Sequence, residues 1–338
     1  MSETVVEFMQ KSAKKYPCGR LAHDARKKLV KAFTSKDEHR QVQDSAMFEA
    51  IIDDVMKTKK GRETMVALSK LGYSFAFERA VQKGKGKFGG FCDPEQKKIV
   101  INPDSDYEYM LRVAVHEGRH AIQYSLDNPK APGYQEMQVA SALRKRRAIE
   151  ADAVAHEMAF VYECKDILPD VYQKTKEKNL PMLAAFEKEM ENSGNERKAM
   201  QAAFAAWYEC DSYRTFYDQE HKKDVAGLCG MVKRNGKTDA FSQEYPVEDV
   251  VKMCCYKGQP YMTAKFLNTG LAFSIPPEDK AEISAIMQDY AAAVPGAEAD
   301  ASVMTMHDRK PVVSPAPVKR KNQAKAAAIA AALGHKGR

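Results

Sequence analysis

The sequence has little of what marks membrane, secreted or fibrous proteins. Its 338 residues include seven cysteines without regular spacing, which does not predict a disulfide framework. No stretch approaches the run of about 18 uncharged apolar residues that a membrane helix requires. The first twenty residues contain acidic and basic side chains and no apolar run of signal-peptide length. We therefore expect a soluble, cytoplasmic protein without membrane contact, with export without a cleaved signal as the alternative.

Positive charge is concentrated in the last residues of the chain. Residues 301–338 hold eight basic side chains and one acidic one, a difference that equals the whole formal net charge of +7. The rest is neutral, whereas a DNA-binding domain has its basic stripe on the folded surface. We therefore expect no nucleic-acid binding beyond a weak contribution from this tail, whose Ala, Pro, Ser and Lys content predicts disorder.

Hydrophobic periodicity predicts an α+β fold that is predominantly helical. Alternation at residues 73–77 and the apolar run at 98–102 indicate strands of a small antiparallel or mixed sheet. Long helices are expected at 106–122, 138–164 and 195–221. We divide the chain into an N-terminal helical segment (1–70), a central domain (71–225), a helical extension (226–300) and the basic tail (301–338).

The helix predicted from residue 106 contains the sequence His116-Glu117-Gly118-Arg119-His120, an HExxH motif. At about 3.6 residues per turn, the two histidines lie one turn apart on one face and can chelate one zinc ion. Glu117 is offset by about 100° and can act as general base on a metal-activated water. A chance match on a surface helix is the alternative, but the flanking residues are too apolar for a solvated helix.

A catalytic zinc needs a third protein ligand and an open position for water. On the next predicted helix, Glu150 lies on the same face as Leu143, Val154 and Val161. This apolar face is the one expected to pack inward. A buried salt bridge is the alternative role for Glu150. Asp152 and His156 point to another side of this helix and remain the fallback ligands.

These motifs together resemble the zincin metallopeptidases of the gluzincin type. Residues 71–217 in particular are similar to a bacterial family of metallopeptidases whose function is unknown. The resemblance implies a zincin-like core with one zinc ion held by His116, His120 and Glu150, and Glu117 as catalytic base. It also implies that residues 98–102, or their hairpin partner, form the edge strand that holds an extended peptide.

The sequence departs from the gluzincin pattern after the third ligand. Many gluzincins have Asp or Asn four residues beyond the ligand glutamate, whereas this position is Val154 here. The carboxylate that orients a ligand histidine must therefore come from elsewhere in the chain. Near the end of the third predicted helix, Tyr213, Arg214 and Tyr217 are candidates for stabilising an oxyanion.

We therefore predict a zinc-dependent peptidase that acts on a peptide or protein substrate. Two alternatives remain: a regulatory or interaction protein that binds metal without cleaving, and an exported effector protease. The presence of Glu117 favours the enzyme, since a purely structural zinc site has no use for that carboxylate. The sequence does not predict an oligomeric state.

Overall fold

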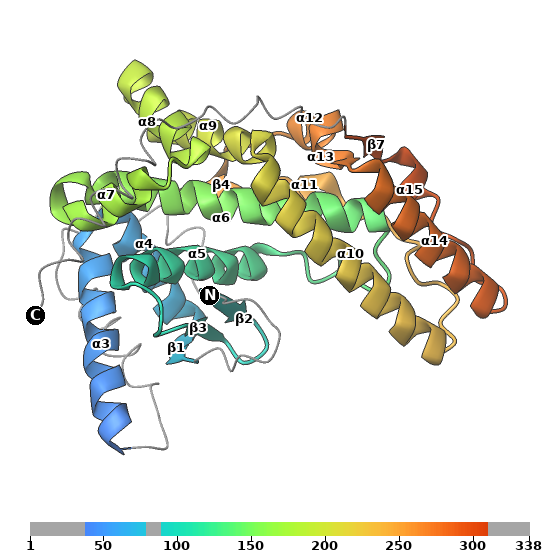
Figure 1. The fold of residues 1–338 in the computed structure, drawn as a ribbon, viewed down its shortest axis with the longest axis horizontal. Coiled ribbons are helices and arrows are strands. Elements are labelled where there is room, and N and C mark those ends of the chain that lie inside the picture. The colour runs from blue at the N-terminus through green and yellow to red at the C-terminus, as the bar shows by residue number, and fades with distance from the viewer. Residues whose placement is uncertain (1–37, 79–88, 310–338) are drawn as a thin grey trace, which may run out of the picture. The chain divides into compact units, whose positions relative to one another are not determined.

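The computed structural model describes residues 38–78 and 89–309, with the backbone alone at 38–46. Over these residues the protein is predominantly helical with three small sheets, which confirms this part of the predicted fold class (Figure 1). The predictions for residues 1–37 and for 310–338, most of the basic tail, lie outside the described residues. Among the described helices, none combines the length and apolar character that crossing a bilayer requires.

The elements that build the site come first along the chain. They are α3 (Glu38–Lys57), α4 (Lys59–Leu71), β1 (Ser74–Phe77), β2 (Gly90–Asp93), β3 (Lys98–Ile101), α5 (Tyr107–Leu126) and α6 (Val139–Ile167). Helices α5 and α6 correspond to the first two predicted long helices, with ends displaced by a few residues.

The remaining elements follow α6 along the chain and continue to residue 308, and most of these helices pack against α6. They are α7 (Pro169–Glu177), α8 (Pro181–Ser193), α9 (Glu196–Glu209), α10 (Asp211–Arg234), α11 (Val247–Met253), β4 (Cys255–Tyr256), β5 (Gln259–Pro260), α12 (Ala264–Leu267), α13 (Gly270–Phe273), β6 (Ser274–Ile275), α14 (Pro277–Ala293), α15 (Ser302–Thr305) and β7 (His307–Asp308).

The largest sheet is mixed and has the order β1-β3-β2. Strand β1 runs parallel to β3, and β2 runs antiparallel to it, with Phe91 opposite Val100. The resemblance offered two candidates for the edge strand, and the structure puts β3 in the centre of the sheet. Of the two candidates, β2 is therefore the edge strand, because it has β3 as its one neighbour among the described strands.

Two glycines allow the sheet and α4 to approach α5 closely. A Cβ atom on Gly90 of β2 would lie 2.5 Å from Cγ1 of Val113, so a larger residue would push β2 away from α5. A Cβ atom on Gly118 of α5 would lie 2.6 Å from Cγ2 of Thr64 on α4. Helix α5 therefore lies in close contact with both neighbours, and α6 packs alongside it (Figure 1).

The third predicted helix, 195–221, is wrong as a single element. The structure ends α9 at Glu209 and starts α10 at Asp211, because Cys210 between them adopts an extended conformation with φ −88° and ψ 99°. Helix α10 then continues to Arg234 and includes the domain boundary predicted between residues 225 and 226. The described residues up to Asp308 form one compact unit.

Candidate metal centre

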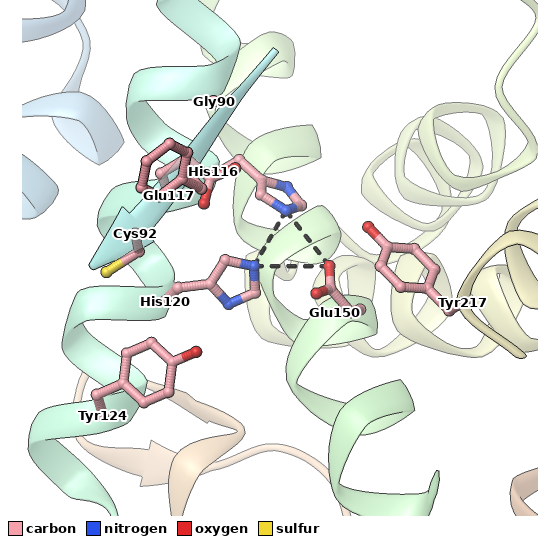
Figure 2. Close-up of a pocket in the computed structure, with 9 residues that line it drawn as sticks. Gly90, Cys92, His116, Glu117, His120, Tyr124, Glu150 and Tyr217 are labelled. Atoms are coloured by element: carbon pink, nitrogen blue, oxygen red, sulfur yellow. Dashed lines mark hydrogen bonds and ion pairs between the residues drawn. The ribbon is translucent and has the colours of Figure 1, made fainter. Parts of the chain in front are cut away.

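Helices α5 and α6 bring three potential metal ligands together (Figure 2). The Nε2 atoms of His116 and His120, one turn apart on α5, are separated by 3.2 Å. Oε2 of Glu150 on α6 lies 3.5 Å from each of these nitrogens. In the described part of the chain, this is the only group of three or more His, Cys, Asp or Glu side chains whose donor atoms are close enough to hold one ion.

The tautomer of His116 is determined by a buried carboxylate. Its Nδ1 lies 3.1 Å from Oε2 of Glu157, and Oε1 of Glu157 accepts a hydrogen bond of 2.7 Å from Nε of Arg112. Burial alone would raise the pKa of Glu157, but the positive charge of Arg112 and the contact with His116 lower it to about 2. Because an ionised carboxylate only accepts hydrogen bonds, Nδ1 donates, and Nε2 directs its lone pair toward Glu150.

The tautomer of His120 is determined by an amide. Nδ1 of His120 lies 2.8 Å from Oε1 of Gln123. The amide nitrogen of Gln123 donates to the backbone oxygen of Ile149 at 2.8 Å and to Oδ2 of Asp152 at 2.6 Å. Since both amide hydrogens are used, Oε1 must accept from Nδ1, and the Nε2 lone pair of His120 also faces Glu150.

Three lone pairs thus converge on one space, which suits a cation. Oε2 of Glu150 is buried and accepts no hydrogen bond from any described residue. Burial alone would raise the pKa of Glu150, but the adjacent His120 and His116 lower it well below its usual value and keep the oxygen ionised. Without an ion, Glu150 and Glu157 in turn raise the pKa of His116 against the effect of burial, because they stabilise a positive charge here. A metal cation would replace the proton on Nε2 and bind to the lone pair that it leaves.

The spacing of the donor atoms fits zinc. A tetrahedral zinc ion with bonds of about 2.0–2.1 Å separates its ligand atoms by about 3.3 Å. The observed separations are 3.2 Å between the two nitrogens and 3.5 Å from each nitrogen to the Glu150 oxygen. Two imidazoles and one carboxylate are also a donor set that zinc accepts, and they leave a fourth position open.

Glu117 lines the same cavity as the three candidate ligands. The cavity has a volume of about 280 Å³, and the other residues around it are Gly90, Phe91, Cys92, Tyr124 and Tyr217. Burial raises the pKa of Glu117, which makes its carboxylate a stronger base than an exposed glutamate. The β2 residues form one wall, so the outer strand of the sheet, which has β3 as its one neighbour among the described strands, lies beside the candidate metal ligands.

One of the three candidates for stabilising an oxyanion reaches this cavity. Tyr217 on α10 directs its hydroxyl toward Glu150 from the side opposite β2 (Figure 2). Burial and the Glu150 carboxylate raise the pKa of Tyr217 well above its usual value, which keeps the hydroxyl protonated. Tyr213 and Arg214 are not part of the cavity lining, and Arg214 instead pairs with Asp211.

The fallback ligands are not among the converging donors, and Asp152 instead belongs to a buried hydrogen-bonded network that reaches His120 through Gln123. Asp152 accepts hydrogen bonds from Nε of Arg119 at 2.6 Å and from the hydroxyl of Tyr261 at 2.7 Å. Nε2 of His156 lies 3.0 Å from the backbone oxygen of Cys255. Among the described residues, Glu150 makes its ion pairs with the two histidines and with no arginine.

Two residues that were not predicted from the sequence orient the two candidate ligand histidines. Glu157 lies seven residues after Glu150, and on a helix this spacing places the two side chains within about 20° of each other. The spacing was therefore a signal in the sequence that Glu157 faces the same site. Gln123 lies three residues after His120, where side chains on a helix are neighbours. Many gluzincins have an orienting acid at the position of Val154. Here the carboxylate that orients His116 is Glu157, two helical turns beyond Glu150.

Comparison with known proteins shows which family the chain belongs to. No curated protein and no solved structure shows significant similarity to it. The family model described as "Putative metallopeptidase family (DUF6782)" matches residues 25–250, which is more than half of the sequence and includes every residue of the candidate metal centre. The chain therefore belongs to this metallopeptidase family.

Proposed function

We propose that the protein is a zinc-dependent peptidase with a zincin-like core. The observation that carries the proposal is the convergence of three lone pairs, from His116, His120 and Glu150, beside the Glu117 carboxylate in one cavity. Three protein ligands with an open fourth position are typical of catalytic zinc, whereas structural zinc sites are closed by four. Membership of a metallopeptidase family supports the same class of activity.

Each residue of the cavity has a distinct chemical task in this proposal. When bound, zinc supplies Lewis acidity that lowers the pKa of a water molecule and polarises the substrate carbonyl. Glu117 accepts the proton of the attacking water and then donates it to the leaving amine. The protonated hydroxyl of Tyr217 donates a hydrogen bond to the carbonyl oxygen as negative charge develops on it.

Strand β2 has β3 as its one neighbour among the described strands, and its other edge provides a binding surface for the substrate backbone. A peptide in extended conformation can pair with this edge as an additional strand. Because Gly90, Phe91 and Cys92 also line the cavity, a backbone paired there passes the candidate metal ligands. We therefore propose a peptide, or an extended segment of a protein, as the substrate.

Substitution Glu117→Gln tests the proposal. Glutamine keeps the size of the side chain but is not a base, so we expect bound zinc to remain while hydrolysis of a peptide library falls by about 10²–10⁴-fold. Glu108→Gln is a matched control, because Glu108 lies on the same helix and its carboxylate pairs with Lys174 away from the cavity. This control should retain full activity.

The outcomes separate the proposal from its alternatives. Full hydrolysis by Glu117→Gln would show that another group is the base. Zinc binding by both proteins without cleavage of any peptide would instead favour a metal-binding regulatory or interaction protein. An exported effector protease would show the same cleavage chemistry, and the two are distinguished by detecting the protein outside the cell.

A further inference from the structure

A hydrogen-bonded path connects His120 to the C-terminal part of the chain. Gln123, which accepts from Nδ1 of His120, donates to Oδ2 of Asp152 at 2.6 Å. The other oxygen of Asp152, Oδ1, accepts from the hydroxyl of Tyr261 at 2.7 Å. Asp152 and Gln123 are fully buried, and Tyr261 is only 3% exposed, so water does not compete for these contacts.

The segment that contains Tyr261 is attached directly to the HExxH helix. Nη2 of Arg119 donates to the backbone oxygens of Met253 at 2.7 Å and Cys255 at 3.1 Å. The backbone nitrogen of Tyr261 donates to the oxygen of Cys254 across the β4–β5 hairpin at 3.2 Å. Helix α5 and this hairpin therefore have fixed relative positions, and the Tyr261 hydroxyl reaches Asp152 in a defined direction.

The two oxygens of Asp152 have different hydrogen-bond donors. Oδ2 accepts from Gln123 and also from Nε of Arg119, while Oδ1 has Tyr261 as its hydroxyl donor. Nε2 of His156 is 3.7 Å from Oδ1, and its closer contact is the backbone oxygen of Cys255. Without the Tyr261 hydroxyl, the Asp152 carboxylate is held through Oδ2 alone, and the direction of the Gln123 amide is less well defined.

We propose that Tyr261 is a positioning residue of the metal centre, which acts on His120 through Asp152 and Gln123. The inference rests on the proposed zinc site and extends it to a segment outside the 71–225 domain predicted from the sequence. His116 is oriented from within that range, by Glu157 and Arg112. The C-terminal extension is thus part of the metal centre, because it determines the orientation of one of the two ligand imidazoles.

Zinc affinity of the full chain, measured by competition with a chromophoric chelator, tests this inference. Gln123→Met, which keeps the length of the side chain, should raise the zinc Kd by about 10–100-fold, the usual effect of losing a partner of a ligand histidine. Tyr261→Phe should raise it by about tenfold, the low end of that range, because it acts indirectly. Tyr290→Phe is the matched control: its hydroxyl also makes a 2.7 Å hydrogen bond, to the backbone oxygen of Lys237.

The double variant separates positioning from general destabilisation. If Tyr261 acts through Gln123, Tyr261→Phe should have no further effect on zinc affinity in the Gln123→Met background. The visible absorption of bound Co²⁺ should change in Tyr261→Phe and not in Tyr290→Phe.

Three results would overturn the inference. Equal zinc affinities of Tyr261→Phe and Tyr290→Phe would do so, as would a Tyr261→Phe effect of the same size in both backgrounds. A wild-type chain that takes up neither zinc nor Co²⁺ would refute the proposed metal site itself, and this inference with it.

Discussion

Substitution Glu157→Gln should weaken metal binding although Glu157 is not a proposed ligand. In the wild type, one carboxylate oxygen accepts from Arg112 and the other accepts from His116. Glutamine has a single acceptor oxygen and a donor nitrogen, so it cannot satisfy both neighbours. If its oxygen faces Arg112, its amide hydrogens meet the N–H of His116. The imidazole then has to move its proton to Nε2, where the metal would bind.

The expected magnitude follows from the loss of this partner. Removing the group that orients a ligand histidine usually lowers metal affinity by about 10–100-fold, or about 1.4–2.7 kcal/mol. The metal-free protein should also lose stability, since the side chains of Arg112 and Glu157 are only 7% and 9% exposed. Breaking a buried ion pair costs about 3–5 kcal/mol, and we expect the lower end because glutamine still accepts one hydrogen bond.

Chelator competition measures the affinity, and denaturant unfolding of the metal-free protein measures the stability. Glu163→Gln is the matched control: Glu163 lies on the same helix, and its carboxylate accepts from the backbone nitrogen of Lys60 at 2.7 Å, away from the metal centre. Its zinc affinity should equal that of the wild type. If Glu157→Gln binds zinc within about twofold of the wild type, Glu157 does not determine the tautomer of His116.

Three other predictions concern the ligand set, the response to acid and helix packing. Glu150→Gln should weaken zinc binding by more than Asp152→Asn, for which we expect about 10–100-fold; the opposite order in a chelator titration would contradict the ligand assignment. Burial and nearby arginines lower the pKa of His221 to about 3. Below about pH 6.5 the imidazole of His221 therefore takes up a proton in the unfolded chain but not in the folded one. Between pH 7 and 5, the metal-free wild type should lose about 2 kcal/mol more unfolding free energy than His221→Gln. Equal losses would refute this prediction. Gly118→Ala should destabilise the protein by about 1–2 kcal/mol through overpacking. Gly227→Ala, which has open space around it, should stabilise the protein by up to about 1 kcal/mol. Denaturant midpoints measure both changes.

Local spacing was enough to predict which three side chains converge. His116 and His120 are four residues apart, and helical phase distinguished Glu150 from Asp152 on the next helix. These inferences need only the geometry of a single helix and the rule that its apolar face packs inward. The same arithmetic applied two turns further would have indicated Glu157, but only the structure shows that its partner is His116.

Features that depend on the path of the chain were not predictable in this way. The contact between Asp152 and Tyr261 joins residues 109 positions apart and depends on where the β4–β5 hairpin packs. The parallel pairing of β1 with β3 likewise depends on how the chain returns between them. The break between α9 and α10 falls at Cys210, where neither glycine nor proline marks the end of a helix.

Metal analysis of the purified full chain tests the central claim most directly. We expect about one equivalent of zinc per chain in the wild type, and loss of that zinc in His116→Ala and in His120→Ala, because each removes one of three converging donors. A wild-type chain without zinc or any other divalent metal, or a His116→Ala variant that keeps its full metal content, would contradict it.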